Sequence, residues 1–227
     1  MIAVDGRHGA AQAEEEARAD VCGVVLCGGA SSRMGRDKAT LALGGRTLLE
    51  RAADCLSAVA AETVLAVGPR RRYGELGLTC VLDRQGDVGP AAGIRAALAA
   101  VDAEWFCVLA CDMPRVDRSL FDALLARARR DELDCCFAVA REDLPEPVCA
   151  VYHRRCLAPM EAALAAGRRR VLAFLEFPGA DGRALRSGNV PAAEPAGSAA
   201  GRERVLNLNT PEEWARERTR DGEGDPR

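Results

Sequence analysis

The segment Val24–Leu41, which reads VVLCGGASSRMGRDKATL, passes from an apolar run through two glycines into a polar and basic stretch. Gly28 and Gly29 permit a tight turn whose backbone N–H groups face an anion. The cations that follow are Arg33, Arg36 and Lys38, with Asp37 as the single opposing acid. This combination of backbone amides and positive charge predicts a loop that binds phosphate groups. The alternative is a surface loop whose charges are only solvated.

Two better-known phosphate-binding loops do not fit this segment. The Walker motif requires Gly-Lys-Ser/Thr, whereas Gly35 is followed by Arg36, Asp37, Lys38 and Ala39. The dinucleotide fingerprint G-x-G-x-x-G is not supplied either. The loop therefore needs another explanation.

A second candidate group is Asp112, which ends the apolar run in VLACDMPRV. Mg²⁺ prefers hard oxygen ligands and takes one or two carboxylates together with substrate phosphates. Asn209, in VLNLNTPEEW, follows another expected strand and offers an amide oxygen to the same ion. The alternatives are that Asp112 caps a turn and that Asn209 caps the helix expected from Thr210 and Pro211.

Short apolar runs alternate with longer amphipathic runs along the chain. The expected strands are Val21–Cys27, Thr63–Val67, Leu78–Leu82, Trp105–Cys111, Cys135–Ala140, Val148–Tyr152 and Val205–Leu208. The expected helices are Arg46–Ala60, Ala91–Val101, Arg118–Arg130 and Arg154–Ala166. Nearly unbroken apolar strands between helices are typical of a mostly parallel sheet covered on both faces. We therefore expect an α/β protein, a three-layer αβα sandwich with a Rossmann-like central sheet.

Such sheets bind their ligands beyond the carboxyl ends of the strands. The segments after Cys27, Leu82 and Cys111 should meet at that edge, and they hold the unusual polar residues. The Gly-, Pro- and Ala-rich stretch Pro178–Glu203 is expected to be a loop excursion around a short strand at Ala184–Val190.

Composition and charge exclude several classes of protein. The 227 residues suggest one domain at 21–218, between flexible tails at 1–20 and 219–227. The net charge of −3 argues against nucleic acid or an acidic membrane as a partner. No apolar run reaches the roughly 18 residues of a membrane span. The first twenty residues lack the pattern of a secretory signal. The ten cysteines form no CxxC pair and lie mostly in apolar runs, so we expect core thiols in a reduced, cytoplasmic setting without zinc.

At this point the motifs match a known family. LCGGASSRMGRDK resembles the signature L-x-G-G-x-S-x-R-M-G-x-D-K of the MobA-like nucleotidyltransferases, whose best-known members are molybdenum cofactor guanylyltransferases. Further segments resemble the family in the same order over about Val21–Trp214: GPAAGIRAAL, CDMP, PEPVCAVYH, GRRRV and NLNTPEE. The resemblance implies the nucleotide-diphospho-sugar transferase type of fold. It also implies a magnesium-dependent transfer of GMP from GTP to the terminal phosphate of (molybdenum-)molybdopterin, with pyrophosphate as the second product.

The resemblance implies roles for individual residues. The implied nucleotide-binding residues are Leu26, Cys27, Gly28, Gly29, Lys38, Asp83 and Asp112. The implied catalytic residues are Arg33, Lys38 and Asp112, and the implied magnesium ligands are Asp112 and Asn209. Asp83 matches a family position that contacts guanine, where a carboxylate accepts from both the N1–H and the exocyclic amine. The alternative for Asp83 is a turn-initiating acid.

Four features depart from the family pattern. Cys27 stands where alanine is usual, Ala91 replaces a leucine, and Ala66 stands where guanylyltransferases can carry a base-contacting asparagine. The fourth is the long Pro178–Glu203 excursion. The arginines at 168–170 either meet an acidic pterin phosphate or form a solvated run.

GTP and molybdopterin are therefore the expected small-molecule partners, with molybdoenzymes or other cofactor-biosynthesis proteins as candidate protein partners. One alternative function is a cytidylyltransferase acting on the same pterin, or a sugar-phosphate nucleotidyltransferase. The other is a non-catalytic module that binds a nucleotide or delivers a cofactor.

Overall fold

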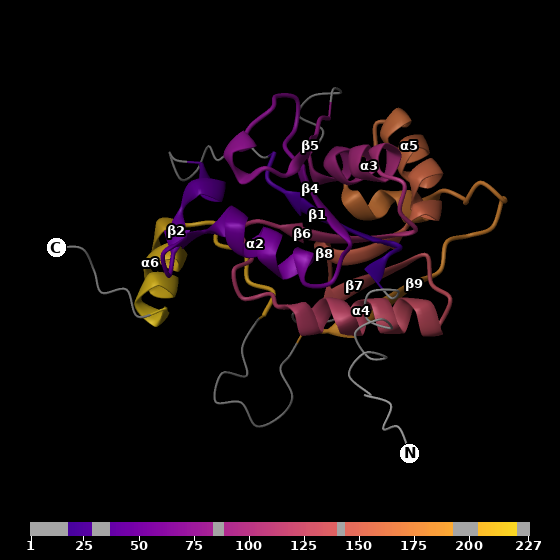
Figure 1. Ribbon diagram of the computed structural model, residues 1–227. Coiled ribbons are helices and arrows are strands. Elements are labelled where there is room, and N and C mark those ends of the chain that lie inside the picture. Colours follow the sequence, from indigo (N-terminus) through magenta and orange to yellow (C-terminus); the bar gives the residue numbers. More distant parts are fainter. Residues whose placement is uncertain (1–17, 29–36, 84–88, 140–143, 193–203, 222–227) are drawn as a thin grey trace, which may run out of the picture.

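The computed structural model of the chain describes residues 18–28, 37–83, 89–139, 144–192 and 204–221 (Figure 1). Its main sheet has seven strands in the order β5-β4-β1-β6-β8-β7-β9. The strands of this sheet are β1 (Val21–Leu26), β4 (Glu62–Ala66), β5 (Thr79–Val81), β6 (Trp105–Ala110), β7 (Cys135–Val139), β8 (Pro145–His153) and β9 (Ser187–Pro191). Two short strands, β2 (Ala42–Leu43) and β3 (Arg46–Thr47), form a separate antiparallel pair.

Helices surround this sheet. The α-helices are α2 (Leu48–Ser57), α3 (Pro90–Ala100), α4 (Arg118–Arg130), α5 (Leu157–Ala165) and α6 (Pro211–Arg220). The 3₁₀ helices are η1 (Lys38–Thr40), η2 (Gly74–Leu76), η3 (Arg154–Cys156) and η4 (Val171–Glu176). None of the helices in the described ranges is long and apolar enough to cross a membrane.

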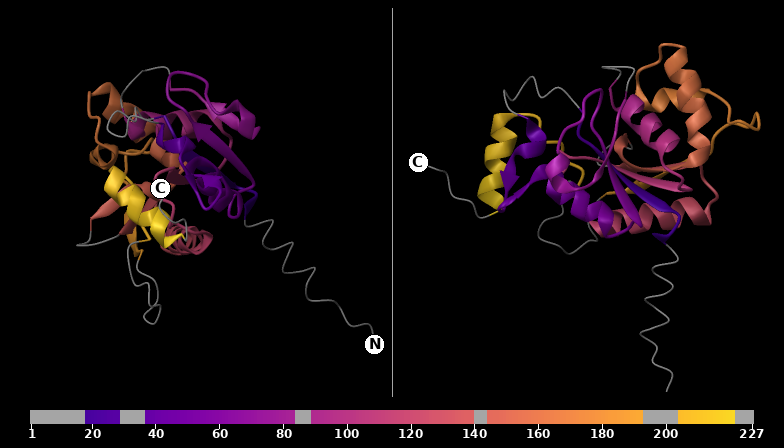
Figure 2. Two further views of the ribbon diagram at one scale, coloured as in Figure 1. Left: turned by 90° about the vertical axis from the view of Figure 1, so that its left-hand side faces the viewer. Right: turned by 45° about the horizontal axis from the view of Figure 1, so that its top comes forward.

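The sheet is mostly parallel and lies between two helical layers. Strands β5, β4, β1 and β6 pair in parallel, whereas β8 pairs antiparallel with both β6 and β7. Helices α2 and α4 pack on one face of the sheet, and α3 and α5 cover the other (Figures 1 and 2). The predicted α/β sandwich with a mostly parallel central sheet is confirmed.

Local sequence explains why the first strand and helix form where they do. Every residue of β1 from Val21 to Val25 is buried, as expected for a strand covered on both faces. Helix α2 begins with a capping box in which Thr47 and Glu50 each satisfy a backbone N–H of the other. The apolar side of this helix and of the turn after it is buried in the core: Leu49, Ala52, Ala53, Leu56 and Val59.

One predicted strand is wrong. The segment 205–208 is not a strand, although its apolar pattern resembles one. Both sides of β6 are already paired, with β1 and with β8, so this segment has no open edge to join there. It passes the carboxyl end of β6 instead, and the Leu208 N–H donates to the Asp112 carbonyl at 2.9 Å.

Several predicted boundaries also move. The short strand expected at 184–190 is β9, at Ser187–Pro191, which pairs in parallel with β7. Strand β8 begins at Pro145, three residues before its predicted start. The first turn of the helix predicted from Arg154 is the 3₁₀ helix η3. Helix α6 continues to Arg220, two residues into the tail expected at 219–227. Most of the expected tail at 1–20, residues 1–17, lies outside the described residues, as do residues 222–227.

The ten cysteines carry free thiols. Eight of them are buried, and they pack among apolar side chains on both faces of the sheet. Cys55 and Cys80 are half-buried and border the same core. The expectation of core thiols is therefore confirmed.

Candidate active site

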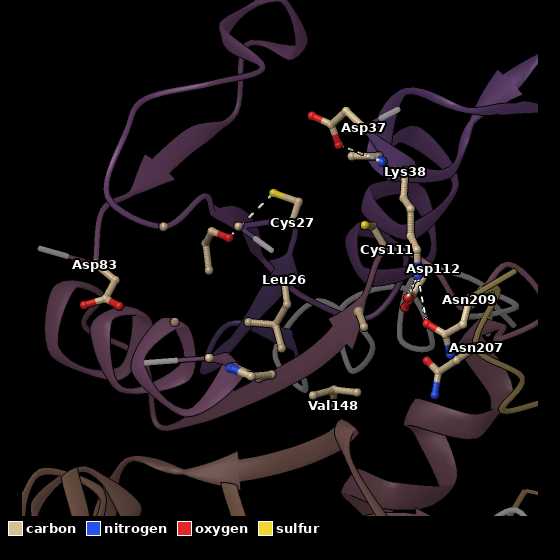
Figure 3. A pocket seen from close by; sticks show the side chains of 18 of the residues that line it. Leu26, Cys27, Asp37, Lys38, Asp83, Cys111, Asp112, Val148, Asn207 and Asn209 are labelled. Atoms are coloured by element: carbon tan, nitrogen blue, oxygen red, sulfur yellow. Dashed lines mark hydrogen bonds and ion pairs between the residues drawn. The ribbon is translucent and has the colours of Figure 1, made fainter. Parts of the chain in front are cut away.

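A pocket of about 510 Å³ opens at the carboxyl ends of β1, β4 and β6 (Figure 3). This is the edge where the sequence placed the ligand. The pocket is lined by six residues that were predicted to bind the nucleotide: Leu26, Cys27, Gly28, Lys38, Asp83 and Asp112. Because β8 runs opposite to β6, it is the beginning of β8 that reaches this edge, and Val148 lines the pocket there.

Gly28 is placed where a side chain has no room. A Cβ atom at this position would lie 2.6 Å from the backbone nitrogen of Gly68 and 2.9 Å from the carbonyl carbon of Val67. Gly68 itself has a φ of 76°, in the left-handed region that favours glycine. The chain leaving β1 therefore passes against the chain leaving β4, and both backbones border the pocket.

Lys38 reaches across the pocket to two oxygen atoms from distant parts of the chain. Its Nζ lies 3.1 Å from Oδ2 of Asp112 and 2.8 Å from Oδ1 of Asn209 (Figure 3). The side chains of Lys38 and Asp112 are 17% and 19% exposed, so this ion pair is accessible to a ligand but partly shielded from water. The three residues come from η1, from the end of β6 and from the segment before α6.

The helix-capping alternative for Asn209 can be resolved from the same region. Helix α6 is capped by Thr210, whose hydroxyl accepts from the Glu213 N–H in a capping box. The side-chain oxygen of Asn209 accepts from Lys38 instead. Asn209 is therefore available to the pocket.

The oxygen atoms of Asp112 and Asn209 suit a magnesium ion. They converge on one cation, the ammonium of Lys38, which marks the point where a positive charge is stabilised between them. A carboxylate and an amide oxygen are the hard ligands that Mg²⁺ takes when substrate phosphates supply further oxygens. Within the described residues, no group of three or more His, Cys, Asp or Glu side chains gathers at a metal-binding distance. The protein oxygens would thus form only part of a magnesium shell, as is usual for this ion.

Two polar residues that the sequence analysis did not select border the same region. Asn207 lines the pocket, and its amide donates to Oε2 of Glu146 at 3.4 Å. Burial raises the pKa of the Glu146 carboxyl, and the nearby charge of Asp112 acts in the same direction. In the extended segment before α6, alternate residues point to opposite sides. Asn207 and Asn209 therefore face the pocket together, as the N-x-N spacing permits.

Asp83 lies at another end of the pocket and is only 5% exposed. Its backbone N–H donates to the Gly68 carbonyl at 3.0 Å, and its Oδ1 lies 3.5 Å from the guanidinium of Arg95 on α3. The guanidinium of Arg95 thus supplies the opposite charge that a buried carboxylate requires. Ala66 lines the pocket nearby, with a methyl group in place of a hydrogen-bonding side chain.

The two thiols of the pocket are not nucleophiles. Burial raises the pKa of Cys27 to about 12, and burial also raises the pKa of Cys111 well above its usual range. Both therefore remain neutral thiols near neutral pH. Cys27 contributes its backbone instead, with an N–H that donates to the Ala66 carbonyl at 3.1 Å.

The remaining predicted residues are not part of this arrangement as described. Arg33 and Gly29 lie outside the described residues. The arginines at 168–170 are exposed and do not line the pocket, and Arg168 pairs with Glu176 at 2.5 Å. This position favours the solvated-run alternative for the three arginines.

Comparison with known proteins gives one consistent picture. Residues 23–180 match the model of a family described as MobA-like NTP transferase domain. A probable molybdenum cofactor guanylyltransferase of Opitutus terrae is 37% identical over 203 residues, which cover 87% of this chain and 95% of that protein. A molybdenum cofactor guanylyltransferase of Xanthomonas euvesicatoria pv. vesicatoria is 34% identical over 197 residues, 86% of this chain and 92% of that protein.

Solved structures agree on the fold. Molybdopterin-guanine dinucleotide biosynthesis protein A from Archaeoglobus fulgidus superposes with a TM-score of 0.67 at 24% identity, over 89% of this chain and 100% of that one. A 2-C-methyl-D-erythritol 4-phosphate cytidylyltransferase from Thermus thermophilus has a TM-score of 0.63 at 18% identity, over 86% of this chain and 96% of that one. The three-layer fold is thus shared with proteins that are named for different products.

Proposed function

This chain belongs to the MobA-like NTP transferase family, and from that premise we propose that it is a molybdenum cofactor guanylyltransferase. The proposed reaction transfers GMP from GTP to the terminal phosphate of molybdopterin and releases pyrophosphate. The observation that carries the proposal is the meeting of Lys38, Asp112 and Asn209 around one point of the pocket, in a chain whose relatives bear that name.

The pocket offers separate places for the parts of GTP. The base and ribose would lie between Leu26, Ala66 and Asp83, beside the close backbones of Gly28 and Gly68. The triphosphate would then extend toward Lys38 and the start of α3, where the backbone N–H groups of the first helical turn carry partial positive charge.

The transfer is a displacement at phosphorus. An oxygen of the acceptor phosphate forms a bond to the α-phosphorus of GTP, and the bond from that phosphorus to the oxygen of the β-phosphate breaks, with the electron pair leaving on pyrophosphate. Catalysis of this kind depends on positioning and on neutralised charge. The acceptor phosphate is already ionised near neutral pH, so no side chain needs to remove a proton.

Charge neutralisation falls to a small number of groups. The ammonium of Lys38 would stabilise the negative charge that grows on pyrophosphate, a role that Arg33 would share. Asp112 and Asn209 would hold a magnesium ion, which neutralises phosphate charge when bound. Asn207 and Glu146, beside Asp112, would border the side from which the acceptor enters.

One observation favours the cytidylyltransferase alternative. The methyl group of Ala66 forms no hydrogen bond to a base, which removes one means of preferring guanine. Asp83 remains the residue that would read the N1–H and amine of guanine.

The test is pyrophosphate release by the purified protein with molybdopterin, Mg²⁺ and either GTP, CTP or ATP. The proposal expects the highest kcat/KM with GTP. A preference for CTP would establish the cytidylyltransferase instead. If pyrophosphate is released with none of the three nucleotides, but the protein still binds a nucleotide, the protein is a binding or delivery module.

A further inference from the structure

The segment that carries Lys38 is held in place by residues to which the proposed function gives no role. We infer that the hydroxyl of Tyr73 is a positioning group for nucleotide binding and transfer, and that it fixes Lys38 through the carboxylate of Asp37. The inference rests on the proposed role of Lys38 in holding phosphate. It adds a residue to the functional site that touches neither the reacting atoms nor the metal ligands.

Tyr73 has an unusual backbone conformation for its surroundings. Its φ of 60° and ψ of 34° lie in the left-handed region, and its side chain is only 7% exposed. A bulky residue in this region costs free energy and persists where its surroundings hold it in place. Tyr73 lies in the loop between β4 and β5, and its side chain is part of the core that also contains Cys27, the residue after β1.

The hydroxyl of Tyr73 donates to Oδ2 of Asp37 at 2.5 Å and lies 3.5 Å from the carbonyl oxygen of Cys27. Burial and then the bond to Asp37 raise the pKa of Tyr73 far above its ordinary value, so the hydroxyl keeps its proton and remains a donor. A hydroxyl that donates to a carboxylate makes one of the stronger hydrogen bonds in proteins.

Asp37 connects the Tyr73 hydroxyl to the backbone of the next residue, Lys38. Its other oxygen, Oδ1, accepts from the Ala39 N–H at 3.1 Å and thereby caps η1, whose first residue is Lys38. The Asp37 carbonyl accepts from the Thr40 N–H at 3.2 Å and from the Thr40 hydroxyl at 2.9 Å. Lys38 is therefore fixed in its backbone from both sides, while its ammonium remains directed at Asp112.

Arg72 supports the same arrangement from the other side. Its guanidinium lies 3.7 Å from Oδ2 of Asp37, donates to the carbonyl oxygens of Cys27 and Val67 at 3.4 and 3.2 Å, and sits 5.4 Å from the centre of the Tyr73 ring. The loop after β4 is thus tied to the end of β1 and to the Lys38 segment at once.

Asp37 uses its two oxygens on different partners. One caps the backbone that carries Lys38, and the other takes the Tyr73 hydroxyl. Loss of the hydroxyl leaves Oδ2 of Asp37 with the Arg72 guanidinium at 3.7 Å, so the carboxylate, and with it the cap on η1, is held less firmly. The expected result is a misplaced ammonium in a folded protein, because a displacement of about 1 Å at a catalytic group costs up to about a hundredfold in rate.

The experiment compares Tyr73→Phe with Tyr152→Phe. Tyr152 is the matched control, because its buried hydroxyl donates at 2.6 Å to the Pro147 carbonyl, far from Asp37 in the sequence. Both variants should stay folded, with unfolding temperatures only about a few degrees below that of the wild type, because each loses one hydrogen bond. Tyr73→Phe should lower kcat/KM for GTP about tenfold, as expected for one lost hydrogen bond to a charged group, whereas Tyr152→Phe should stay within about twofold of the wild type.

A double-mutant cycle with Lys38→Ala separates positioning from a general structural effect. If Tyr73 acts through Lys38, Tyr73→Phe should lower kcat/KM by less than about twofold once Lys38 is alanine. The same tenfold loss in both backgrounds, or no loss in the wild-type background, would overturn the inference.

A binding measurement keeps this test distinct from that of the proposed function. Calorimetric titration with inorganic tripolyphosphate should show weaker binding by Lys38→Ala and, to a smaller extent, by Tyr73→Phe. If the wild type releases no pyrophosphate, the proposed function fails. The double-mutant cycle is then evaluated from the dissociation constants of tripolyphosphate. Unchanged tripolyphosphate affinity in Tyr73→Phe, with weakened affinity in Lys38→Ala, would overturn the positioning role alone.

Discussion

Two pockets of nearly equal volume, about 510 and 500 Å³, lie at opposite ends of the sheet and differ in how their charged side chains are paired. The second lies at the amino ends of β1, β6, β7 and β9, and its walls carry Arg129, Arg155 and Arg186. There each arginine has its own carboxylate. Arg129 pairs with Asp20 and Arg155 with Asp134, both at 2.6 Å, and Arg186 lies 3.5 Å from Glu132.

In the first pocket the ammonium of Lys38 is shared by Asp112 and Asn209. The rest of that wall is largely glycine backbone and small side chains. The difference suggests a criterion for telling the two apart. The paired charges of the second pocket tie elements of the fold together, whereas the shared ammonium of Lys38, beside open backbone, can be given to a ligand. Volume alone does not distinguish them.

The largest effect is expected at Asp112. Asp112→Asn should lower kcat by about 10²–10³-fold and raise the magnesium concentration needed for half-maximal turnover, because a neutral amide binds a divalent ion more weakly than a carboxylate does. Steady-state pyrophosphate release at several magnesium concentrations measures this. The matched change in the second pocket, Asp134→Asn, should instead lower the free energy of unfolding by about 1–3 kcal/mol and leave kcat near that of the wild type. Equal losses of kcat in the two variants would contradict the comparison.

Lys38→Ala should lower kcat/KM for GTP about a hundredfold, since it removes charge stabilisation in the transition state. Its control is Arg155→Ala, which removes a cation of the second pocket and should leave kcat/KM within about twofold, as expected for a partly exposed ion pair. Wild-type turnover in Lys38→Ala would remove the lysine from the mechanism.

Gly28→Ala should weaken GTP binding about tenfold, because the added Cβ would lie 2.6 Å from a backbone atom and force the two strand ends apart. Gly74→Ala is the control, since no atom lies within 4 Å of a Cβ added there. The dissociation constants of GTP for both variants decide the matter, and equal values would show that the close approach is not needed for binding.

Asp83→Asn should narrow the preference for GTP over CTP by roughly tenfold, because the amide can no longer accept two hydrogen bonds from guanine. The ratio of kcat/KM for the two nucleotides measures this. An unchanged ratio would assign Asp83 to the structure, where its pairing with Arg95 would be its whole role.

The smallest effect is a pH dependence in the second pocket. Burial, and then the guanidinium of Arg155, lower the pKa of His153 below its ordinary value of 6.5, against the opposing effects of Glu104 and Asp134. Below pH 6.5 the unfolded chain therefore takes up this proton before the folded chain does, and the free energy of unfolding falls as the pH falls.

His153→Asn should flatten this part of the pH profile while keeping the acceptor for the Arg155 N–H, which His153 now supplies through Nδ1 at 3.0 Å. Chemical denaturation of both proteins between about pH 5 and 7 tests the prediction. If the free energies of unfolding of the two proteins change with pH in parallel, groups other than His153 determine the stability in acid.

The architecture could be predicted because apolar runs and their lengths determine it. The alternation of strands and helices predicted the sheet and its two helical layers. Because such sheets bind ligands beyond the carboxyl ends of their strands, it also predicted the edge at which Lys38 and Asp112 meet. The error at 205–208 has a simple cause. A run of alternating apolar residues satisfies the pattern of a strand, but pairing requires a free edge, and edges depend on the whole topology.

The site was predicted as far as its residues follow strands directly. Asn207 could not be predicted from local sequence, because its place in the pocket depends on a contact with Glu146, 61 residues away. Tyr73 was missed for a similar reason. In PRRRYGELG it resembles part of a surface turn, and neither its left-handed conformation nor its contact with Asp37, 36 residues away, is encoded in local pattern.

The lysine between Asp112 and Asn209 has a consequence for the order of loading. At rest, the tethered ammonium already balances the carboxylate, so a bare divalent ion must compete with a cation that never diffuses away. A triphosphate that arrives together with its metal brings the negative charge that draws the lysine aside. Under the proposed function, the enzyme would therefore be selective for the metal–nucleotide complex over either component alone.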